Sequence, residues 1–273
     1  MTLYPAPGKL NLFLHVVGKR SDGYHELQTV FRLVERADRI GIAVDGDGEI
    51  RLSGTAFEND LCVRAATALQ QASGCTKGCQ LALEKILPVG GGMGGGSSDA
   101  ATVLLVLNRL WNLNLKQIEL MKLGERLGAD VPFFLFGGNA IGEGIGERLQ
   151  ALELPPAWYL VLTPQVAVST KEIFNDRALT ANTKRLKIPP FLSGQGTNDL
   201  EPIVRRRFPD VAAHLEWLKS RVPGARMTGS GACVFAEFRT EAEALALERE
   251  LRGSMRGFVT QGLQKHPLHD WAA

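Results

Sequence analysis

The sequence predicts an α+β fold made of two domains, and three observations carry that prediction. Strand-like and helix-like segments follow one another without a regular βαβ rhythm, which argues against a doubly wound sheet. The chain has 273 residues, 45% of them hydrophobic, so it is long enough for two cores. Leu154-Pro155-Pro156 interrupts regular structure between two patterned regions. We therefore expect one domain over residues 1–154 and a second over residues 155–273.

The first half contains the clearest strand, from Lys9 to Val16, where the pattern alternates. One face takes Leu10, Leu12, Leu14 and Val16, and the other takes Lys9, Asn11, Phe13 and His15. Lys9 and Asn11 can therefore point into one cleft. Further strands are expected over Tyr24–Val34, Asp38–Val44, Glu49–Leu52 and Cys79–Glu84. Helices are expected over Leu61–Ala72, Ser98–Trp111 and Lys116–Leu127.

The second half mixes the same two kinds of element. Strands are expected over Trp158–Leu162, Ala232–Phe238 and Gly257–Leu263. Helices are expected near Asn198–Arg207 and Val211–Arg221. The capping box Thr240-Glu241-Ala242-Glu243 predicts the start of another helix.

Composition narrows the class of protein. The charged fraction is 22%, which is ordinary for a globular protein. The formal net charge of +2 is too small to suggest a surface that binds nucleic acid or membrane. The N-terminus lacks the basic and apolar segments of a signal peptide, and no apolar run reaches the roughly 18 residues of a membrane helix. Four cysteines are too few for a disulfide scaffold. We expect a cytoplasmic protein without nucleic-acid or membrane partners, and its oligomeric state stays open.

The most informative stretch is Pro88-Val89-Gly90-Gly91-Gly92-Met93-Gly94-Gly95-Gly96-Ser97-Ser98-Asp99. Its glycines lead into an apolar helix, and a helix N-terminus offers unpaired N–H groups and partial positive charge. Glycines let a phosphate approach this backbone without meeting a Cβ. Ser97 and Ser98 can cap the helix, bind phosphate oxygens or reach a magnesium ion. The alternative is a tight connection with a serine cap.

The kind of phosphate loop can be narrowed by elimination. Gly90-x-Gly92-x-x-Gly95 formally matches the dinucleotide fingerprint, but the helix leads into another helix, without the required strand and acidic residue. A P-loop needs Gly-Lys-Ser/Thr, and the run contains no lysine. A protein-kinase glycine loop lies in a hairpin and opens no helix. A different ATP-binding design remains.

The run resembles the phosphate-binding motif of the GHMP kinases, and other motifs resemble the family in the same order. These are Pro7-Gly8-Lys9-Leu10-Asn11-Leu12, Asp22-Gly23-Tyr24-His25, Gly128-Ala129-Asp130-Val131-Pro132-Phe133-Phe134 and Thr228-Gly229-Ser230-Gly231-Ala232-Cys233-Val234-Phe235. The resemblance implies a ribosomal-protein-S5-like N-terminal domain and a ferredoxin-like C-terminal domain, with the active site in the cleft between them.

Within the family, the motifs resemble members that act on a cytidine-diphosphate-linked methylerythritol. The resemblance implies that the γ-phosphate of ATP, accompanied by Mg²⁺, moves to the 2-hydroxyl of that small molecule in isoprenoid precursor synthesis. It also implies that Asp130 is the base and Lys9 its partner. A carboxylate can take the hydroxyl proton while an ammonium orients it and offsets charge. From the pattern alone, Asp130 is equally consistent with a helix N-cap, and Lys9 with a solvated strand lysine.

The same resemblance assigns the remaining site residues. It implies that Tyr24 stacks on the cytosine, that His25 bonds to it, and that Phe174 covers the other face. Asn11 and Thr170 are expected to contact the substrate, and Lys85 to lie near the adenine. The plain alternatives are packing roles for the aromatic residues and a simple turn at Gly229-Ser230-Gly231, which in the family packs near the nucleotide loop.

Other interpretations remain open from the sequence. The chain could be a GHMP kinase for homoserine or a mevalonate, or a nucleotide-binding regulator without catalysis. Asn59-Asp60 departs from the order of residues expected near the adenine-ribose end, and residues 181–195 match poorly. Asp99 is expected only to complement the helix dipole, and His214 and His266 to lie at the surface. No metal ligands can be assigned.

Overall fold

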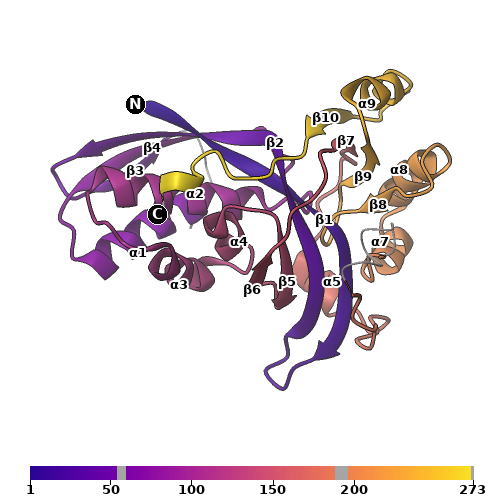
Figure 1. The fold of residues 1–273 in the computed structure, drawn as a ribbon, viewed down its shortest axis with the longest axis horizontal. Helices are drawn as coiled ribbons and strands as arrows, with labels where there is room; N and C mark the ends of the chain where they lie inside the picture. The colour runs from indigo at the N-terminus through magenta and orange to yellow at the C-terminus, as the bar shows by residue number, and fades with distance from the viewer. Residues whose placement is uncertain (54–59, 188–195, 272–273) are drawn as a thin grey trace.

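The computed structural model describes residues 1–53, 60–187 and 196–271, and it contains two β-sheets with helices packed on each (Figure 1). The first sheet contains β1 (Thr2–Lys19), β2 (His25–Asp45), β3 (Ile50–Ser53), β4 (Gly78–Glu84), β5 (Ala140–Gly144) and β6 (Arg148–Ala151). The second contains β7 (Trp158–Leu162), β8 (Arg226–Met227), β9 (Val234–Phe238) and β10 (Gly257–Gln261). The first sheet pairs β3 with β4 in parallel, and the other pairs are antiparallel.

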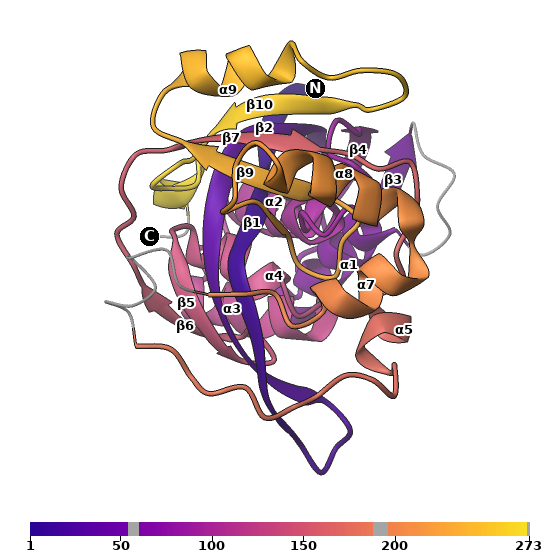
Figure 2. The same cartoon turned by 90° about the vertical axis from the view of Figure 1, so that its right-hand side faces the viewer.

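The helices form two groups, one beside each sheet. Those beside the first sheet are α1 (Leu61–Ser73), α2 (Gly95–Leu110), α3 (Gln117–Leu127) and α4 (Val131–Phe136). Those of the second half are α5 (Thr170–Phe174), α7 (Glu201–Arg207), α8 (Pro209–Lys219) and α9 (Glu241–Glu248), and a short 3₁₀ helix, η1 (His269–Trp271), lies near the C-terminus. In the view of Figure 2, α8 lies in front of β9, and these two elements are in contact. No helix in the described ranges is long and apolar enough to cross a membrane.

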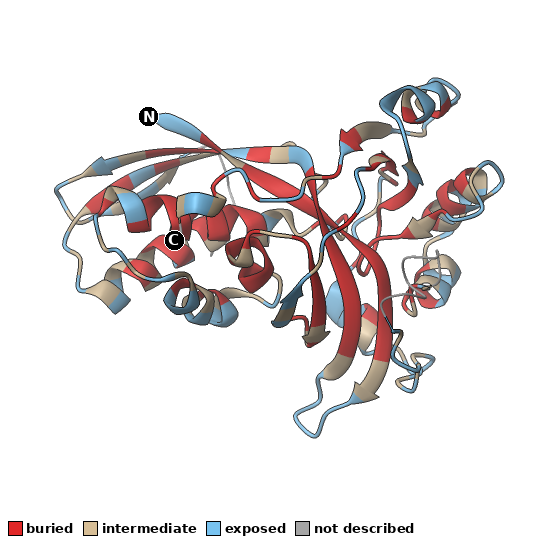
Figure 3. Ribbon diagram, in the orientation of Figure 1, coloured by how far each residue is buried: buried red, intermediate tan, exposed pale blue. Residues whose placement is uncertain are grey.

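The long hairpin of β1 and β2 runs through both halves of the molecule. Near its open end, Tyr4 and Ile40 pack in the core beneath α1 and α2. Nearer the tip, Leu14 and Leu27 join the core of the second sheet. The burial colours of Figure 3 show long buried stretches in both strands of the hairpin, and in β2 such a stretch runs from Leu27 to Val34. The hairpin, which belongs to the first half of the chain, thus contributes to both cores. The domain boundary at residue 154 stays a prediction.

Two expectations about this hairpin are wrong. The segments predicted as separate strands form one, β2, because pairing with β1 resumes at Ala37 and Asp38 after a register shift opposite the exposed Glu35 and Arg36. The alternation along β1 is also interrupted, since the register shifts between Asn11 and Phe13. A bulge of this kind adds a residue to one strand and re-aims the side chains that follow.

Most other expected elements are confirmed, with changes at their ends. Helix α2 begins at Gly95 and not at Ser98, so the last glycines already belong to the helix. The capping box is present, with the hydroxyl of Thr240 accepting from the backbone N–H of Glu243. The sequence pattern predicts none of α4, β5, β6 and α5, each of which has six residues or fewer. Such short elements show too little periodicity to be recognised.

The C-terminal segment returns from β10 to the first sheet (Figure 1). The backbone N–H of Leu263 donates to the carbonyl of Leu33, and that of His266 donates to the carbonyl of Gly137 at the end of α4. His266 is consequently buried, and burial lowers the pKa of its imidazole to about 4. His214 is also buried, packed within α8. Both histidines were expected at the surface, and that expectation is wrong.

Candidate active site

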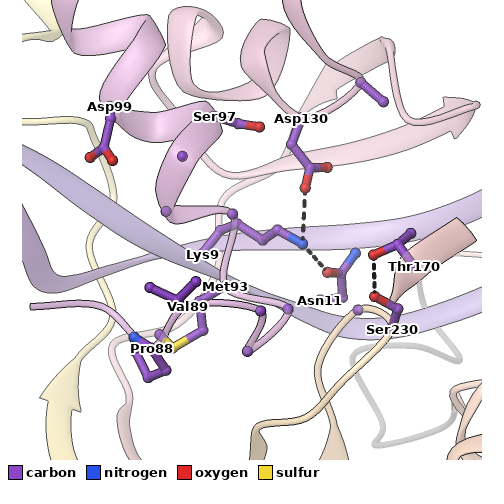
Figure 4. Close-up of a pocket in the computed structure, with 18 of the residues that line it drawn as sticks. Lys9, Asn11, Pro88, Val89, Met93, Ser97, Asp99, Asp130, Thr170 and Ser230 are labelled. Carbon is purple, nitrogen blue, oxygen red and sulfur yellow. Dashed lines mark hydrogen bonds and ion pairs between the residues drawn. The ribbon is translucent and has the colours of Figure 1, made fainter. Parts of the chain in front are cut away.

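The glycine run lines a cavity of about 580 Å³ that takes residues from both halves of the chain (Figure 4). The first half supplies the run itself with Lys9, Asn11, Lys85 and Asp130. The second half supplies Thr170, Phe174, Gly229 and Ser230. The cavity therefore brings together the predicted catalytic pair, the predicted phosphate loop and part of the predicted substrate set.

The loop depends on glycine at alternate positions. Gly90, Gly92 and Gly94 have φ angles of 68°, 77° and 71°, in the left-handed region that side chains disfavour. A Cβ on Gly92 would lie 2.3 Å from the carbonyl oxygen of Thr228, and one on Gly94 would lie 3.1 Å from Cε of Lys9. Gly94 caps α2 without a side-chain bond. The first N–H groups of α2 thus lie open beside the cavity, as an anion site requires.

The two serines after the loop have different environments. Ser97 lines the cavity, beside the entrance to α2 (Figure 4). Ser98 is buried, and its hydroxyl donates to the carbonyl oxygen of Pro7 at 2.7 Å. Ser98 therefore holds α2 against β1, and of the two hydroxyls only that of Ser97 faces the cavity.

Lys9 and Asp130 meet inside this cavity. Lys9 Nζ lies 3.4 Å from Asp130 Oδ2 and donates to Asn11 Oδ1 at 2.5 Å (Figure 4). The Lys9 side chain is 4% exposed, and that of Asp130 is 33% exposed toward the cavity. Asp130 occupies the N-cap position of α4, but its side chain caps no backbone N–H of that helix. Its carboxylate is thus left available for an ion pair and for a ligand.

Asn11 and Lys9 also connect this pair to the loop. The amide of Asn11 donates to Thr29 Oγ1 at 2.9 Å, and its backbone N–H donates to Thr228 Oγ1 at 2.9 Å. The backbone N–H of Lys9 donates to the carbonyl of Met93 within the loop at 2.9 Å. The Thr228 hydroxyl in turn donates to the carbonyl of Gly92 at 3.4 Å, so β1 is joined to the loop directly at Met93 and through Thr228 at Gly92.

The motif from Thr228 to Phe235 packs directly against the glycine loop. The backbone N–H of Ala232 donates to the carbonyl of Gly90 at 3.2 Å, and that of Cys233 to the carbonyl of Gly91 at 3.1 Å. This confirms that the motif packs near the loop. Ser230, which sequence reasoning did not place among the site residues, lines the cavity and bonds with the Thr170 hydroxyl at 2.7 Å (Figure 4).

A second cavity, of about 700 Å³, contains the predicted aromatic residues. Tyr24, which is 61% exposed, and His25 line it together with Phe174. The rings of His25 and Phe174 lie 5.6 Å apart at an interplanar angle of 34°. The two cavities are neighbours, since they share the lining residues Leu27, Ala129, Ile145, Thr170 and Phe174.

The tip of the β1–β2 hairpin orients these aromatic residues. Asp22 accepts from the backbone N–H of Tyr24 at 3.1 Å and from Nε of Arg20 at 3.0 Å. The bond from Tyr24, followed by that from Arg20, lowers the pKa of the Asp22 carboxyl. Burial, with a smaller effect of Lys19, lowers the pKa of His25 below its ordinary value. A neutral imidazole both donates and accepts hydrogen bonds, which suits contact with the edge of a base.

Lys85 lies at the wall of the first cavity between two carboxylates. It contacts Asp38 and lies 2.7 Å from Asp99 Oδ2. Asp99 was expected to act on the helix dipole from outside, but it is buried and paired with Lys85. Burial raises the pKa of Asp99 to about 7, and the charge of Asp38 adds to this against the opposing effect of Lys85.

The described ranges contain no group of three or more His, Cys, Asp or Glu side chains that could hold a metal. Oxygen donors nevertheless line the cavity at Ser97 and Asp130. Magnesium usually takes one or two protein oxygens with substrate phosphates and water, so these residues fit a cation that arrives on a nucleotide.

Of the pair Asn59-Asp60, predicted near the adenine-ribose end, Asn59 lies outside the described residues. Asp60 lines the cavity, and its side chain accepts from the backbone N–H of Cys62 at 2.7 Å.

Two family models match the chain. The model of the GHMP kinases N terminal domain matches residues 60–138, and the GHMP kinases C terminal model matches residues 185–257. Both regions supply residues of the cavity, the first the glycine loop and the second Gly229 and Ser230.

The chain is also similar to named kinases over nearly its whole length. A 4-diphosphocytidyl-2-C-methyl-D-erythritol kinase of Nitrosospira multiformis is 58% identical, over 98% of this chain and 93% of the relative. The enzyme of the same name from Thiobacillus denitrificans is 55% identical, over 98% of each chain. The chain therefore belongs to the GHMP kinases, within the group that contains these 4-diphosphocytidyl-2-C-methyl-D-erythritol kinases.

Solved structures agree with this family. A crystal structure of 4-(cytidine 5'-diphospho)-2C-methyl-D-erythritol kinase matches with a TM-score of 0.86 and 35% identity, covering 96% of this chain and 100% of the other. A mevalonate kinase matches with a TM-score of 0.71 at 16% identity, over 97% of this chain and all of the other, which shows the shared fold alone. The predicted α+β GHMP kinase fold is thereby confirmed.

Proposed function

We propose that this small-molecule kinase transfers the γ-phosphate of ATP to the 2-hydroxyl of 4-diphosphocytidyl-2-C-methyl-D-erythritol, a step in isoprenoid precursor biosynthesis. The names of the full-length relatives support this substrate. The single observation that carries the mechanism is the Lys9–Asp130 pair at 3.4 Å, in a cavity that also contains the glycine loop. We also place the reaction in the cytoplasm, in a cleft between domains 1–154 and 155–273.

The donor side would be the glycine loop and the start of α2. The phosphates of ATP would lie against Pro88–Gly96, where alternate glycines leave the backbone N–H groups exposed. Ser97 would contact a phosphate or hold Mg²⁺, which when bound offsets phosphate charge. Ser98 would contribute by fixing α2 to β1 through Pro7. Lys85, which the family resemblance assigns to the adenine, would lie beside the loop, where it contacts Asp38 and Asp99.

The chemical step would use Asp130 as the general base. A hydroxyl placed between Asp130 and the loop would give its proton to the carboxylate while its oxygen attacks the γ-phosphorus. The new O–P bond would form as the bond to the β-phosphate oxygen breaks and ADP leaves. Lys9, held by Asn11, would orient the carboxylate and offset negative charge on the transferred group.

The acceptor side would be the second cavity. The cytosine would stack between Tyr24 and Phe174, and the neutral imidazole of His25 would bond to its edge. Asn11 and Thr170 line the first cavity on the path from that ring toward Asp130, and they would contact the rest of the substrate. A base-bearing substrate explains this aromatic cavity, whereas homoserine and mevalonate have no ring to place there.

An ATP-consumption assay across three acceptors tests the proposal. The purified chain should turn over with 4-diphosphocytidyl-2-C-methyl-D-erythritol and should consume ATP only at background rate with mevalonate or homoserine. The product should carry its new phosphate on the 2-hydroxyl, which phosphorus NMR can establish. Turnover with mevalonate or homoserine but none with the cytidyl substrate would refute the proposed acceptor.

A further inference from the structure

Lys85, Asp38 and Asp99 form a charged cluster, which we call the loop clamp, at the wall of the first cavity. The Asp38 and Asp99 side chains are 0% and 3% exposed, and that of Lys85 is 21% exposed. Buried carboxylates are costly without a paired cation, and two carboxylates close together repel each other. Lys85 is the cation that contacts both, so it makes their proximity possible.

The clamp connects the two ends of the glycine loop. Asp38, on β2, accepts through Oδ1 from the backbone N–H groups of Ile86 and Leu87, at 2.5 and 2.7 Å, immediately before the loop. Asp99 lies in the first turns of α2, immediately after the loop. Since Lys85 contacts both carboxylates, it ties the entry of the loop to its exit.

The loop also touches the clamp directly. A Cβ built on Gly95, the first residue of α2, would lie 3.2 Å from Asp38 Oδ2 and 3.2 Å from Lys85 Nζ. Within the described part of the chain, Asp99 Oδ1 is buried without a hydrogen-bond partner. The ion pair with Lys85 therefore compensates the Asp99 carboxylate through Oδ2 alone, and the loss of Lys85 would leave more negative charge beside the place where phosphates would bind.

We propose that Lys85 is a positioning residue: by cancelling the charges of Asp38 and Asp99 it lets these two carboxylates lie at the ends of the glycine loop without repelling each other or a bound nucleotide. The inference rests on the proposed function, because it takes the loop as the ATP site. It assigns to Lys85 a role that depends on its two carboxylate partners, which direct contact with an adenine ring would not.

The test compares nucleotide affinity in single and double variants. Measured at about pH 9, well above the pKa of about 7 of Asp99, Lys85→Met should weaken ATP binding at least about tenfold, because the two carboxylates then face the phosphates without their cation. The Michaelis constant for the cytidyl substrate should change less than about twofold, because the second cavity contains no part of the clamp. Lys85→Arg should retain most of the affinity, since a guanidinium can bridge two carboxylates. Lys122→Met, which removes an exposed lysine from α3, is the matched control.

The decisive variant is Lys85→Met combined with Asp99→Asn. Removal of one carboxylate should restore most of the lost ATP affinity, which neither an adenine contact nor a general structural role of Lys85 would predict. Absence of that recovery, or wild-type ATP binding in Lys85→Met, would overturn the proposal. If Lys85→Met does not fold, Asp99→Asn alone decides: it should bind ATP at least as tightly as wild type, and tenfold weaker binding would overturn the charge argument.

Calorimetric titration with ATP and Mg²⁺ measures these affinities without any acceptor. Suppose that the ATP affinities of the variants follow the expected order but wild type phosphorylates none of the acceptors. That result would refute the proposed function and leave the inference about Lys85 standing. Suppose instead that wild type phosphorylates the cytidyl substrate but the double variant does not recover ATP affinity. That result would refute the inference about Lys85 and support the proposed function.

Discussion

The nucleotide loop and the aromatic cavity are built in opposite ways. The loop is made of backbone, and Lys9, Ala232 and Cys233 each bond to its carbonyl groups. The aromatic cavity is made of side chains at a hairpin tip and a short helix, and its Tyr24 is 61% exposed. Substitutions in the loop should therefore disturb the whole site, whereas substitutions in the aromatic cavity should affect one substrate only.

This difference corresponds to what each region would have to recognise. Triphosphate oxygens are bound well by a fixed set of N–H groups, which requires a rigid backbone held from several sides. A planar base is recognised by ring faces and one polar edge, and these need only side chains at the correct separation. Asp130 lines the first cavity at the N-terminus of α4, next to Ala129, which lines both cavities.

Asp130→Asn should have the largest effect on turnover and separates chemistry from binding. The amide keeps the shape of the carboxylate but cannot accept the hydroxyl proton, so kcat should fall about 10²- to 10⁴-fold. ATP affinity should stay close to wild type, because the loop bonds do not involve Asp130. Steady-state kinetics and ATP titration on the same sample check both, and near-wild-type turnover would exclude Asp130 as the base.

Gly92→Ala should have the next largest effect and tests the rigidity of the loop. Alanine is disfavoured at a φ of 77°, and its Cβ would lie 2.3 Å from the carbonyl oxygen of Thr228. The backbone strain alone costs about 1–3 kcal/mol. We expect weaker binding of ATP and a lower melting temperature. Gly46→Ala, whose Cβ would meet nothing within 4 Å, is the matched control and should melt like wild type.

Tyr24→Ala should have a smaller effect, confined to the acceptor. Stacking of a base on an aromatic side chain contributes about 1–3 kcal/mol, so the Michaelis constant for the cytidyl substrate should rise about tenfold or more. The constant for ATP and the melting temperature should stay unchanged, since Tyr24 is largely exposed. Tyr24→Phe retains the ring and should behave like wild type. Equal changes in both Michaelis constants would contradict the separation of the two regions.

The loop could be predicted from the sequence because its chemistry is local. A run of glycines before an apolar helix indicates its backbone conformation directly, and the structure has left-handed φ angles at Gly90, Gly92 and Gly94. The α+β fold class could be predicted because each strand or helix has a local pattern, and these elements follow one another without a regular βαβ rhythm. The motif at Thr228 required the family resemblance, since alone it reads as a turn before a strand.

The clamp and the register of the hairpin could not be predicted, because both depend on distant parts of the chain. Asp38 reaches Ile86 and Lys85, more than forty positions away, and nothing near it in the sequence indicates that contact. Separate strands were predicted on either side of Glu35 and Arg36, but pairing with β1 resumes at Ala37 after a register shift, and β2 continues as one strand. Ser98 looked like a phosphate ligand, whereas the carbonyl it bonds to belongs to Pro7.

The smallest predicted effect concerns pH and again separates the two regions. Burial lowers the pKa of His25 below its ordinary value of 6.5, so the imidazole is neutral at pH 7 and gains a proton only in more acidic solution. Affinity for cytidine diphosphate should therefore be level from about pH 8 to about pH 6.5 and fall below that range, as the protonated ring loses its acceptor nitrogen. His25→Gln keeps a donor and an acceptor but does not titrate, so the difference between its profile and that of wild type isolates His25. Calorimetric titrations of both proteins across this range measure it. A wild-type profile that falls in step with that of His25→Gln would show that His25 does not recognise the base in its neutral form.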